Sequence, residues 1–252
     1  MAFTDDQLER YARHIVLREI GGAGQARLRS AHVAIVGAGG IGCPAIAYLA
    51  AAGIGTLRVI DPDTVSLSNL QRQILFGAED IGRPKPEAAR DAAQRLNPDC
   101  HLIPINERLD PANAATLLRD ADIILDGCDN FETRLAVSDA ATRLRIPLVT
   151  AAVGEFEGQI GVWRGWEDGQ PCYRCLVGDA TTDPARTCAE QGLVGALTGM
   201  IGSMAALEVI RALVPFGTPS TGKLMVLDLL GNRFRTLAVP RDEACPAALA
   251  PA

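Results

Sequence analysis

The chain of 252 residues has few aromatic side chains and very few histidines. Phe, Trp and Tyr make up 4% of it, and the histidines are His14, His32 and His101. None of the three falls in the motifs described below, so a histidine-based hydrolytic or hydride-transfer site is hard to build. Positive charge is not in excess either, because 24 Lys and Arg stand against 30 Asp and Glu. The net charge of −6 argues against a general nucleic-acid-binding surface.

The sequence also lacks a secretory signal and a long hydrophobic run. Residues 1–17 carry charges from the start, without a basic region followed by an apolar one. The longest uncharged apolar stretch, residues 192–207, is shorter than the ~20 residues that span a bilayer, and Glu208 and Arg211 follow at once. We therefore interpret this stretch as a buried helix. We expect a cytoplasmic protein with no membrane partner.

The seven cysteines are an odd number, and no secretory signal accompanies them. This favours reduced thiols over a disulfide scaffold. Cys43, Cys100 and Cys128 fall within or at the ends of expected helices and strands. We expect these three to be thiols of the core.

The order of hydrophobic segments predicts an α/β fold. Strands are expected over residues 32–36, 56–60, 101–105, 122–126 and 147–152, and helices over 41–52, 85–96, 111–119 and 131–144. This alternation predicts a Rossmann-like, mostly parallel sheet with helices on both faces. Later, "EGQIGVWRG" and "KLMVLDL…RFRTLAV" are typical of antiparallel strands, with a turn at Gly231-Asn232. A long helix is expected over 190–213, and a mobile loop over 165–186.

We expect one domain over residues 1–252. It consists of an N-terminal helical arm (1–30), a nucleotide-binding half (31–152) and an antiparallel C-terminal half (153–252). The arm begins with a helix over 5–18. Gly21, Gly22 and Gly24 are expected to form a flexible connection after this helix.

A glycine-rich loop, "GAGGIG", follows the first strand and opens a helix. Gly37, Gly39 and Gly42 have G-x-G-x-x-G spacing, and Asp61 ends the next strand. This is the dinucleotide-binding fingerprint, in which backbone N–H groups approach phosphates and the acid binds ribose hydroxyls. The alternative is a tight strand-to-helix turn without a ligand. The loop alone does not distinguish NAD from ATP.

A polar stretch, "DPDTVSLSNLQRQILF", begins at Asp61. Asn69, Arg72 and Gln73 come just beyond the second strand, and Lys85 starts the next helix. An arginine and a lysine near a glycine loop would neutralise a triphosphate or stabilise a pyrophosphate leaving group. The alternative is that both are solvated surface cations.

The stretch "ILDGCDNFETR" ends another strand and places Asp126, Asp129 and Asn130 at its carboxyl end. Ligands of open α/β sheets bind at this edge. Asp129 is predicted to hold a magnesium ion against phosphate oxygens. The alternative is that Asp129 caps the helix over 131–144, a role that is compatible with the first.

Together these motifs resemble the ThiF/MoeB/HesA family of adenylyltransferases, which is related to ubiquitin-activating enzymes. The similarity runs from "RYARHIVL" to "GKLMVLD". It includes, in the family's order and spacing, "GAGGIG", "DPDTVSLSNLQRQ", "GRPK", "CDNFETR", "EGQI", "CYRC" and "TCAEQG".

The resemblance implies adenylation, with ATP and magnesium, of the C-terminal Gly-Gly carboxylate of a small ubiquitin-like sulfur carrier. Such a ThiS- or MoaD-like carrier would bind the antiparallel half and serve thiamine or molybdopterin biosynthesis. The resemblance also implies a homodimer and a separate sulfur donor, a cysteine desulfurase or a rhodanese.

The resemblance further implies which residues contact the nucleotide. They are Gly37, Gly39, Gly40, Gly42, Asp61, Ser68, Asn69, Arg72, Lys85, Asp129 and Asn130. Asp61 is implied to bind the ribose, and Arg72 and Lys85 to meet the phosphates. Asp129 is implied to place the magnesium. Arg13 of "RYARH" corresponds to an arginine that reaches the phosphates of the neighbouring subunit.

Cys172 and Cys175 form a C-x-x-C motif, which is typical of half a tetrahedral zinc site. In the family the other half is a second C-x-x-C near the C-terminus. Here Cys245 is present, but Ala248 stands three residues further on. Three interpretations stay open: zinc with three cysteines plus another ligand or water, a weak or absent site, and a redox pair.

Cys188 precedes the long apolar helix. A thiol just before a helix N-terminus has a lowered pKa and more thiolate. The resemblance implies a covalent link between this cysteine and the carrier during sulfur transfer. The alternative is an inert cysteine in a loop.

Two other functions explain part of the sequence. An NAD-dependent oxidoreductase accounts for the glycine loop and Asp61, but not for "SNLQRQ", Lys85 or the C-x-x-C motif. A non-catalytic scaffold, like the inactive halves of some ubiquitin-activating heterodimers, usually lacks the arginine or the lysine. Both Arg72 and Lys85 are present here, so we expect an enzyme.

Overall fold

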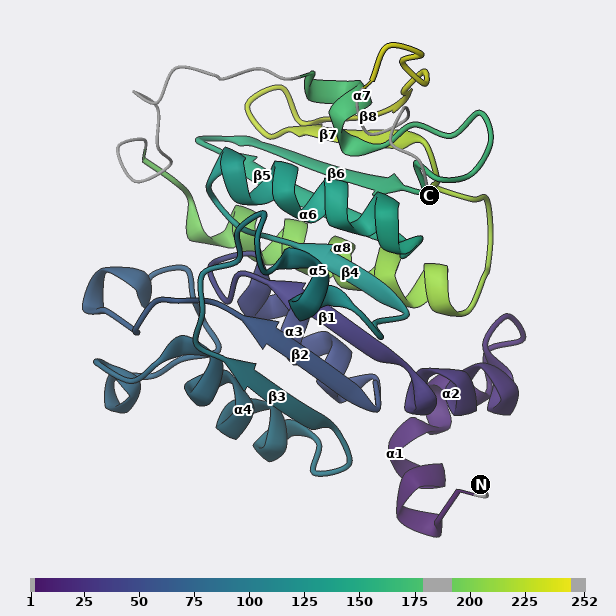
Figure 1. The fold of residues 1–252 in the computed structure, drawn as a ribbon. Helices are drawn as coiled ribbons and strands as arrows, with labels where there is room; N and C mark the ends of the chain where they lie inside the picture. Colours follow the sequence, from purple (N-terminus) through teal and green to yellow (C-terminus); the bar gives the residue numbers. More distant parts are fainter. Residues whose placement is uncertain (1–2, 179–191, 246–252) are drawn as a thin grey trace.

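The computed structural model of the protein describes residues 3–178 and 192–245 (Figure 1). Within these ranges one sheet has eight strands, in the order β3-β2-β1-β4-β5-β6-β7-β8. The strands are β1 (His32–Val36), β2 (Thr56–Ile60), β3 (His101–Ile105), β4 (Ile123–Asp126), β5 (Leu148–Gly154), β6 (Glu157–Trp163), β7 (Lys223–Asp228) and β8 (Arg233–Ala238). Cys188 and Ala248 lie outside the described residues.

The sheet changes direction at β5. The first five strands pair in parallel, whereas the β5–β6, β6–β7 and β7–β8 pairs are antiparallel. The predicted fold class, a Rossmann-like parallel sheet continued by antiparallel strands, is therefore confirmed. Strand order reverses between β1, the central strand of the parallel part, and its neighbour β4.

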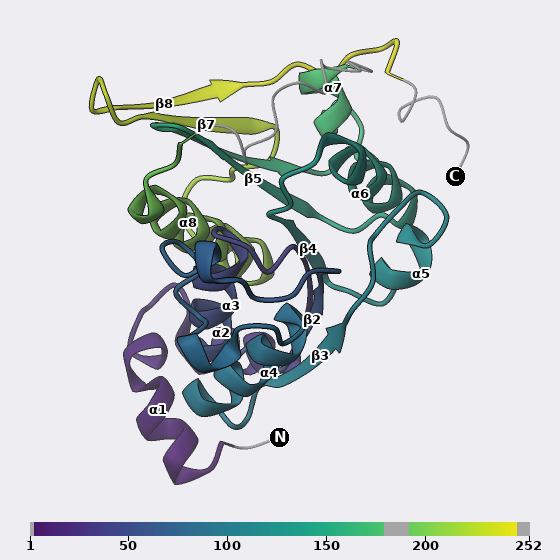
Figure 2. The same ribbon diagram turned by 90° about the vertical axis from the view of Figure 1, so that its left-hand side faces the viewer.

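Helices cover both faces of the sheet (Figure 2). They are α1 (Asp5–Ile15), α2 (Gly21–Ser30), α3 (Gly42–Ala51), α4 (Lys85–Leu96), α5 (Ala114–Leu118), α6 (Phe131–Leu144), α7 (Tyr173–Val177) and α8 (Gly195–Leu213). Val33 and Ile35 of β1 pack with α3, α4 and α8 on one face. Ala34 and Val36 pack with α5 and α6 on the other. Alternate residues of one strand thus enter two cores, which explains its unbroken apolar sequence.

Helix α8 is the one described helix that is long and apolar enough, by length and composition, to cross a membrane. Leu197, Ile201, Ala205 and Val209 of this helix are buried. They belong to the core cluster that α8 forms with α3, β5 and β6. This agrees with the prediction of a buried helix.

Two local predictions are wrong. Gly21, Gly22 and Gly24 lie in the first turn of α2 and do not form a flexible connection. A side chain at Gly24 would meet Val214 Cγ1 at 2.9 Å, so close packing explains a glycine in a helix despite its low propensity. The described part of the expected loop over 165–186 contains the short helix α7. Residues 179–186 lie outside the described residues.

Candidate active site

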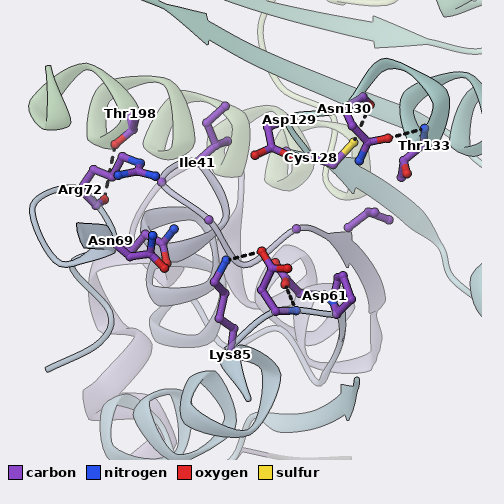
Figure 3. A pocket seen from close by; sticks show the side chains of 18 of the residues that line it. Ile41, Asp61, Asn69, Arg72, Lys85, Cys128, Asp129, Asn130, Thr133 and Thr198 are labelled. Carbon is purple, nitrogen blue, oxygen red and sulfur yellow. Dashed lines mark hydrogen bonds and ion pairs between the residues drawn. The ribbon is translucent and has the colours of Figure 1, made fainter. Parts of the chain in front are cut away.

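A cavity of about 640 Å³ opens where β1, β2 and β4 end. This is the point of strand-order reversal, where open α/β sheets bind their ligands. Figure 3 shows Asn69 and Arg72 on one side of the cavity, Asp129 on the other, and Lys85 and Asp61 below them. Of the predicted nucleotide-binding residues, the cavity is lined by Gly37, Gly39, Gly40, Asp61, Asn69, Arg72, Lys85, Asp129 and Asn130.

The glycine loop turns sharply from β1 into α3. Gly37 has a φ of +94°, which disfavours any residue with a Cβ. A Cβ at Gly42 would lie 2.0 Å from the carbonyl oxygen of Gly37. Gly42 therefore makes the tight turn and lies behind the cavity surface. Gly39 lines the cavity, and a Cβ there would have 3.9 Å to its nearest neighbour.

Asp61 fixes this loop to the end of β2. Its Oδ2 accepts a 2.7 Å hydrogen bond from the backbone N–H of Ala38, and its Oδ1 accepts a 2.8 Å bond from that of Asp63. Burial raises the pKa of Asp61, and the nearby charge of Lys85 opposes this. The carboxylate thus has a structural role in addition to lining the cavity, which the sequence pattern did not indicate.

Lys85 is not a solvated surface cation. Its side chain is only 6% exposed, and Nζ donates a 2.8 Å hydrogen bond to Oδ2 of Asp63. Asp63 itself is 57% exposed at the rim of the cavity. The surface alternative is therefore wrong for Lys85. Lys85 lines the cavity, and among the described residues Asp63 is its ion-pair partner.

Arg72 and Asn69 are held by their own turn. Asn69 Oδ1 accepts from the N–H of Ser66 at 3.3 Å, and Arg72 Nη1 donates to the carbonyl of Ser68 at 3.1 Å. The Ser68 side chain is exposed, bonds to the Ser66 hydroxyl at 3.1 Å, and does not line the cavity. Ser68 therefore orients Arg72 through its backbone and is not brought to the cavity as predicted.

Asn130, and not Asp129, caps α6. Its Oδ1 accepts a 2.8 Å hydrogen bond from the N–H of Thr133. The alternative role of Asp129 as the helix cap is therefore wrong. The Asp129 carboxylate is exposed and points toward the middle of the cavity (Figure 3). It is available to a ligand.

Arg134 is a site residue that the sequence analysis missed. It is buried in the cavity wall, and its Nη2 donates to the carbonyls of Cys128 (2.5 Å) and Ala151 (2.7 Å). Burial opposes its charge, but the nearby carboxylate of Asp126 keeps the pKa of Arg134 above its ordinary value. It thus fixes the loop that carries Asp129. Its position in "CDNFETR", one helical turn after Asn130, places it near the site but does not indicate these backbone partners.

Arg13 is exposed on α1 and does not line the cavity. Figure 1 shows α1 and α2 at the end of the sheet where β1 begins, whereas the cavity lies where β1 ends. Helix α1 is fixed to its own chain, because Arg10 donates to the carbonyl of Leu96 and Tyr11 accepts from Asn97. Among the described residues no ion pair joins Arg13 to Glu9, the pairing that its helix position would allow.

The thiols form two groups. Cys43, Cys100 and Cys128 are buried as predicted, and burial raises the pKa of Cys43 and of Cys100 to about 12. Cys128 also lines the cavity.

The second group is the cysteine cluster, formed by Cys172, Cys175 and Cys245. All three sulfur atoms lie within 4.8 Å of one another. Burial raises the pKa of Cys172 to about 12. Cys175 is half-buried, and burial also raises the pKa of its thiol. Hydrogen bonds, of which the one from the Asp242 backbone is the largest, outweigh this effect, so the pKa of Cys175 is lowered. The cluster has the donor set of a zinc site.

Known proteins resemble the chain over nearly its whole length. The model of the ThiF family matches residues 11–247. The molybdopterin-synthase adenylyltransferase of Escherichia coli strain K12 is 43% identical over 96% of each chain. The sulfur carrier protein ThiS adenylyltransferase of the same strain is 42% identical over 96% of each.

A solved structure of E. coli MccB with MccA-N7isoASN shares the fold. It is 22% identical, with a TM-score of 0.83, over 95% of this chain and 74% of that one. The sequence motifs, the cavity at the strand-order reversal and the match over residues 11–247 agree. The chain belongs to the ThiF family.

Proposed function

We propose that the protein is an ATP-dependent adenylyltransferase. It activates the C-terminal Gly-Gly carboxylate of a small ubiquitin-like sulfur carrier. Family membership implies ATP use, and two close relatives bear the names of adenylyltransferases that serve a sulfur carrier or molybdopterin synthase. One observation carries the proposal: a glycine loop, two cations and a free carboxylate converge on one cavity.

This set of groups suits acyl-adenylate formation. A carboxylate is already ionised near neutral pH, so the reaction needs no general base. Its oxygen attacks the α-phosphorus of ATP, the bond from that phosphorus to the bridging oxygen breaks, and pyrophosphate leaves. The reaction requires in-line positioning and stabilised phosphate charge, and we assign the stabilisation of charge to Arg72 and Lys85. Among the described residues that line the cavity, none is a histidine.

The nucleotide and its magnesium ion have suitable partners in the cavity. Asp129 offers a free carboxylate, which is a preferred magnesium ligand, and it lies beside Asn130. Asp61 lies at the end of β2, where the family's acid binds ribose. The N-terminus of α3 favours the negative phosphates. We assign the cofactor-binding role to these residues.

The cysteine cluster is assigned to zinc. Thiolate is the ligand that structural zinc sites use most, and the three sulfurs are close enough to share one ion. The cluster joins α7 to the C-terminal turn at Cys245. Zinc would therefore stabilise the antiparallel half, residues 153–252, to which we assign carrier binding.

We further propose a homodimer whose active sites each take Arg13 from the partner. Helices α8, α3 and α1 lie on one side of the molecule (Figure 2). On these helices and just after α1, several large apolar side chains are exposed. They are Val16, Leu17, Tyr48, Met200 and Leu207. Such a face suits a two-fold contact between copies, which would also bring Arg13 to the other subunit's cavity.

The remaining parts of the proposal rest on the family resemblance. We propose that residues 1–252 act as one adenylation domain and that a cysteine desulfurase or a rhodanese supplies the sulfur. The location is cytoplasmic. An oxidoreductase is not favoured, because the named relatives are adenylyltransferases. An inactive scaffold is not favoured, because Arg72 and Lys85 both line the cavity.

Exchange of labelled pyrophosphate into ATP tests the proposal. We expect exchange only when a ThiS- or MoaD-like carrier is present, because the carrier supplies the nucleophile. The matched control is the same carrier ending in Gly-Ala, whose methyl group should not pass the narrow approach to the α-phosphate. Equal exchange with both carriers would contradict the recognition of Gly-Gly. Absence of exchange with every carrier would contradict adenylation.

A further inference from the structure

The cysteine cluster has the spacing of thiolates that share one tetrahedral metal ion. The Sγ atoms of Cys172 and Cys175 are 3.7 Å apart, and those of Cys172 and Cys245 are 3.5 Å apart. Zn–S bonds of about 2.3 Å at tetrahedral angles place neighbouring sulfurs about 3.8 Å apart. A disulfide would require about 2.05 Å. The geometry thus fits three ligands of one zinc ion.

Protein contacts hold these three ligands in place. Arg241 Nη1 donates to the carbonyls of Glu167 (3.1 Å) and Gln170 (3.4 Å), which ties the C-terminal turn to the loop before Cys172. The N–H of Cys245 donates to the carbonyl of Asp242 at 3.1 Å. The two segments therefore meet through their own hydrogen bonds, and a metal ion would find three sulfurs already together.

The described residues near the cluster provide no fourth ligand. Among the described residues, the group of metal-binding side chains at this place consists of the three cysteines alone. Beyond Cys245 the sequence reads "PAALAPA", and Pro, Ala and Leu have no side chain that binds zinc. A second C-x-x-C motif would need cysteine at position 248, which is Ala248.

We propose that the cluster binds zinc through three thiolates and leaves the fourth position to an exchangeable ligand from solution. This inference deepens the zinc assignment and is independent of adenylation. The ligand is water in the absence of thiols and a small thiol when one is present, because zinc favours thiolate donors. In the exchange the metal–oxygen bond to water breaks, a metal–sulfur bond forms, and the thiol proton passes to solvent. The half-buried Cys175 marks the open side of the site.

Cobalt(II) substitution tests the open position, because the sulfur-to-cobalt charge-transfer band grows with the number of bound thiolates. Wild-type protein loaded with one cobalt should gain about one third in band intensity when 2-mercaptoethanol is added, as three thiolates become four. The matched control is Ala248→Cys, which restores the second C-x-x-C. It should show the higher intensity from the start and not respond to the thiol.

Several results would overturn the proposal. One is a spectrum of four bound sulfurs in the wild type without added thiol. If Cys188→Ala then shows only three bound sulfurs, Cys188 is the fourth ligand. A second is a three-sulfur spectrum that the thiol leaves unchanged. A third is less than about one tenth of a bound cobalt per chain. The wild-type titration stands alone if Ala248→Cys misfolds, as circular dichroism would reveal. None of these readouts involves ATP or a carrier, so a failed exchange assay leaves them valid.

Discussion

The cavity and the cysteine cluster are assembled in different ways. The cavity collects residues from the ends of parallel strands and the turns that follow them, so strand topology alone places Gly37, Asp61 and Asp129 together. The cluster joins Cys172 to Cys245, which are 73 residues apart, and depends on contacts between two irregular segments. Function at the cavity should therefore be sensitive to charge, and function at the cluster to local packing.

The largest expected effect concerns the two cavity cations. Lys85→Ala and Arg72→Ala should each lower pyrophosphate exchange by roughly 10²–10³, as expected for lost stabilisation of transition-state charge. The matched control is Asp63→Asn, which removes the counterion of Lys85 but keeps the ammonium. It should retain far more exchange than Lys85→Ala. Equal losses in both variants, or a large fall in melting temperature, would mean that the ion pair serves the fold instead.

The second prediction concerns Arg13, which does not line the cavity of its own subunit but is proposed to reach that of its partner. Arg13→Ala should lower exchange by roughly 10², because the partner's phosphates lose a positive charge. Arg13→Ala and Arg72→Ala dimers should regain activity when mixed, since each heterodimer has one site with both arginines. After random subunit exchange about a quarter of all sites would be intact. No recovery after proven exchange would contradict a site shared between subunits.

Features that follow from strand topology could be predicted from the sequence, whereas features that depend on contacts between distant or irregular segments could not. Strands β1, β2 and β3 have the predicted bounds. The apolar run of β1 is buried on both faces and leaves little ambiguity. Most of the residues proposed to bind the nucleotide line the cavity, because their motifs lie at or just beyond strand ends. The role of Arg134 was missed because its partners are backbone carbonyls, which leave no trace in the sequence.

Two details of the structure could not be read from local sequence patterns. The glycines at the start of α2 are typical of a flexible connection, but they form a helix. Gly24 packs there against Val214, a residue far along the chain that local sequence does not reveal. Asp129 and Asn130 are both good helix caps, and only the structure shows which side chain accepts from Thr133. A tertiary contact decided the first case, and local capping geometry, which residue propensity does not resolve, decided the second.

The third prediction separates glycines of the turn from glycines of the cavity. Gly42→Ala should lower the free energy of unfolding by about 2–3 kcal/mol, because its Cβ would collide with the Gly37 carbonyl. Gly39→Ala is the matched control and should change stability by less than about 0.5 kcal/mol. Its methyl group would enter the cavity and raise the KM for ATP. Chemical denaturation and exchange kinetics measure both, and equal destabilisation would contradict this division.

The smallest expected effect is that of Cys188→Ala on adenylation. Cys188 lies outside the described residues, and its covalent role is inferred from the family resemblance. Adenylation transfers no sulfur, so pyrophosphate exchange should be unchanged within about twofold. Formation of the carrier thiocarboxylate, measured by mass spectrometry with a sulfur donor present, should fall strongly if Cys188 forms the covalent link.

Exchange and sulfur transfer in the same variant serve as controls for each other. Loss of both would mean that Cys188 supports the adenylation site, because a sulfur-specific role cannot affect a step without sulfur. Retention of both would make Cys188 a bystander in its loop. Only intact exchange with impaired sulfur transfer separates the two steps. That result would assign adenylation to the cavity at the strand ends and sulfur chemistry to a cysteine beyond it.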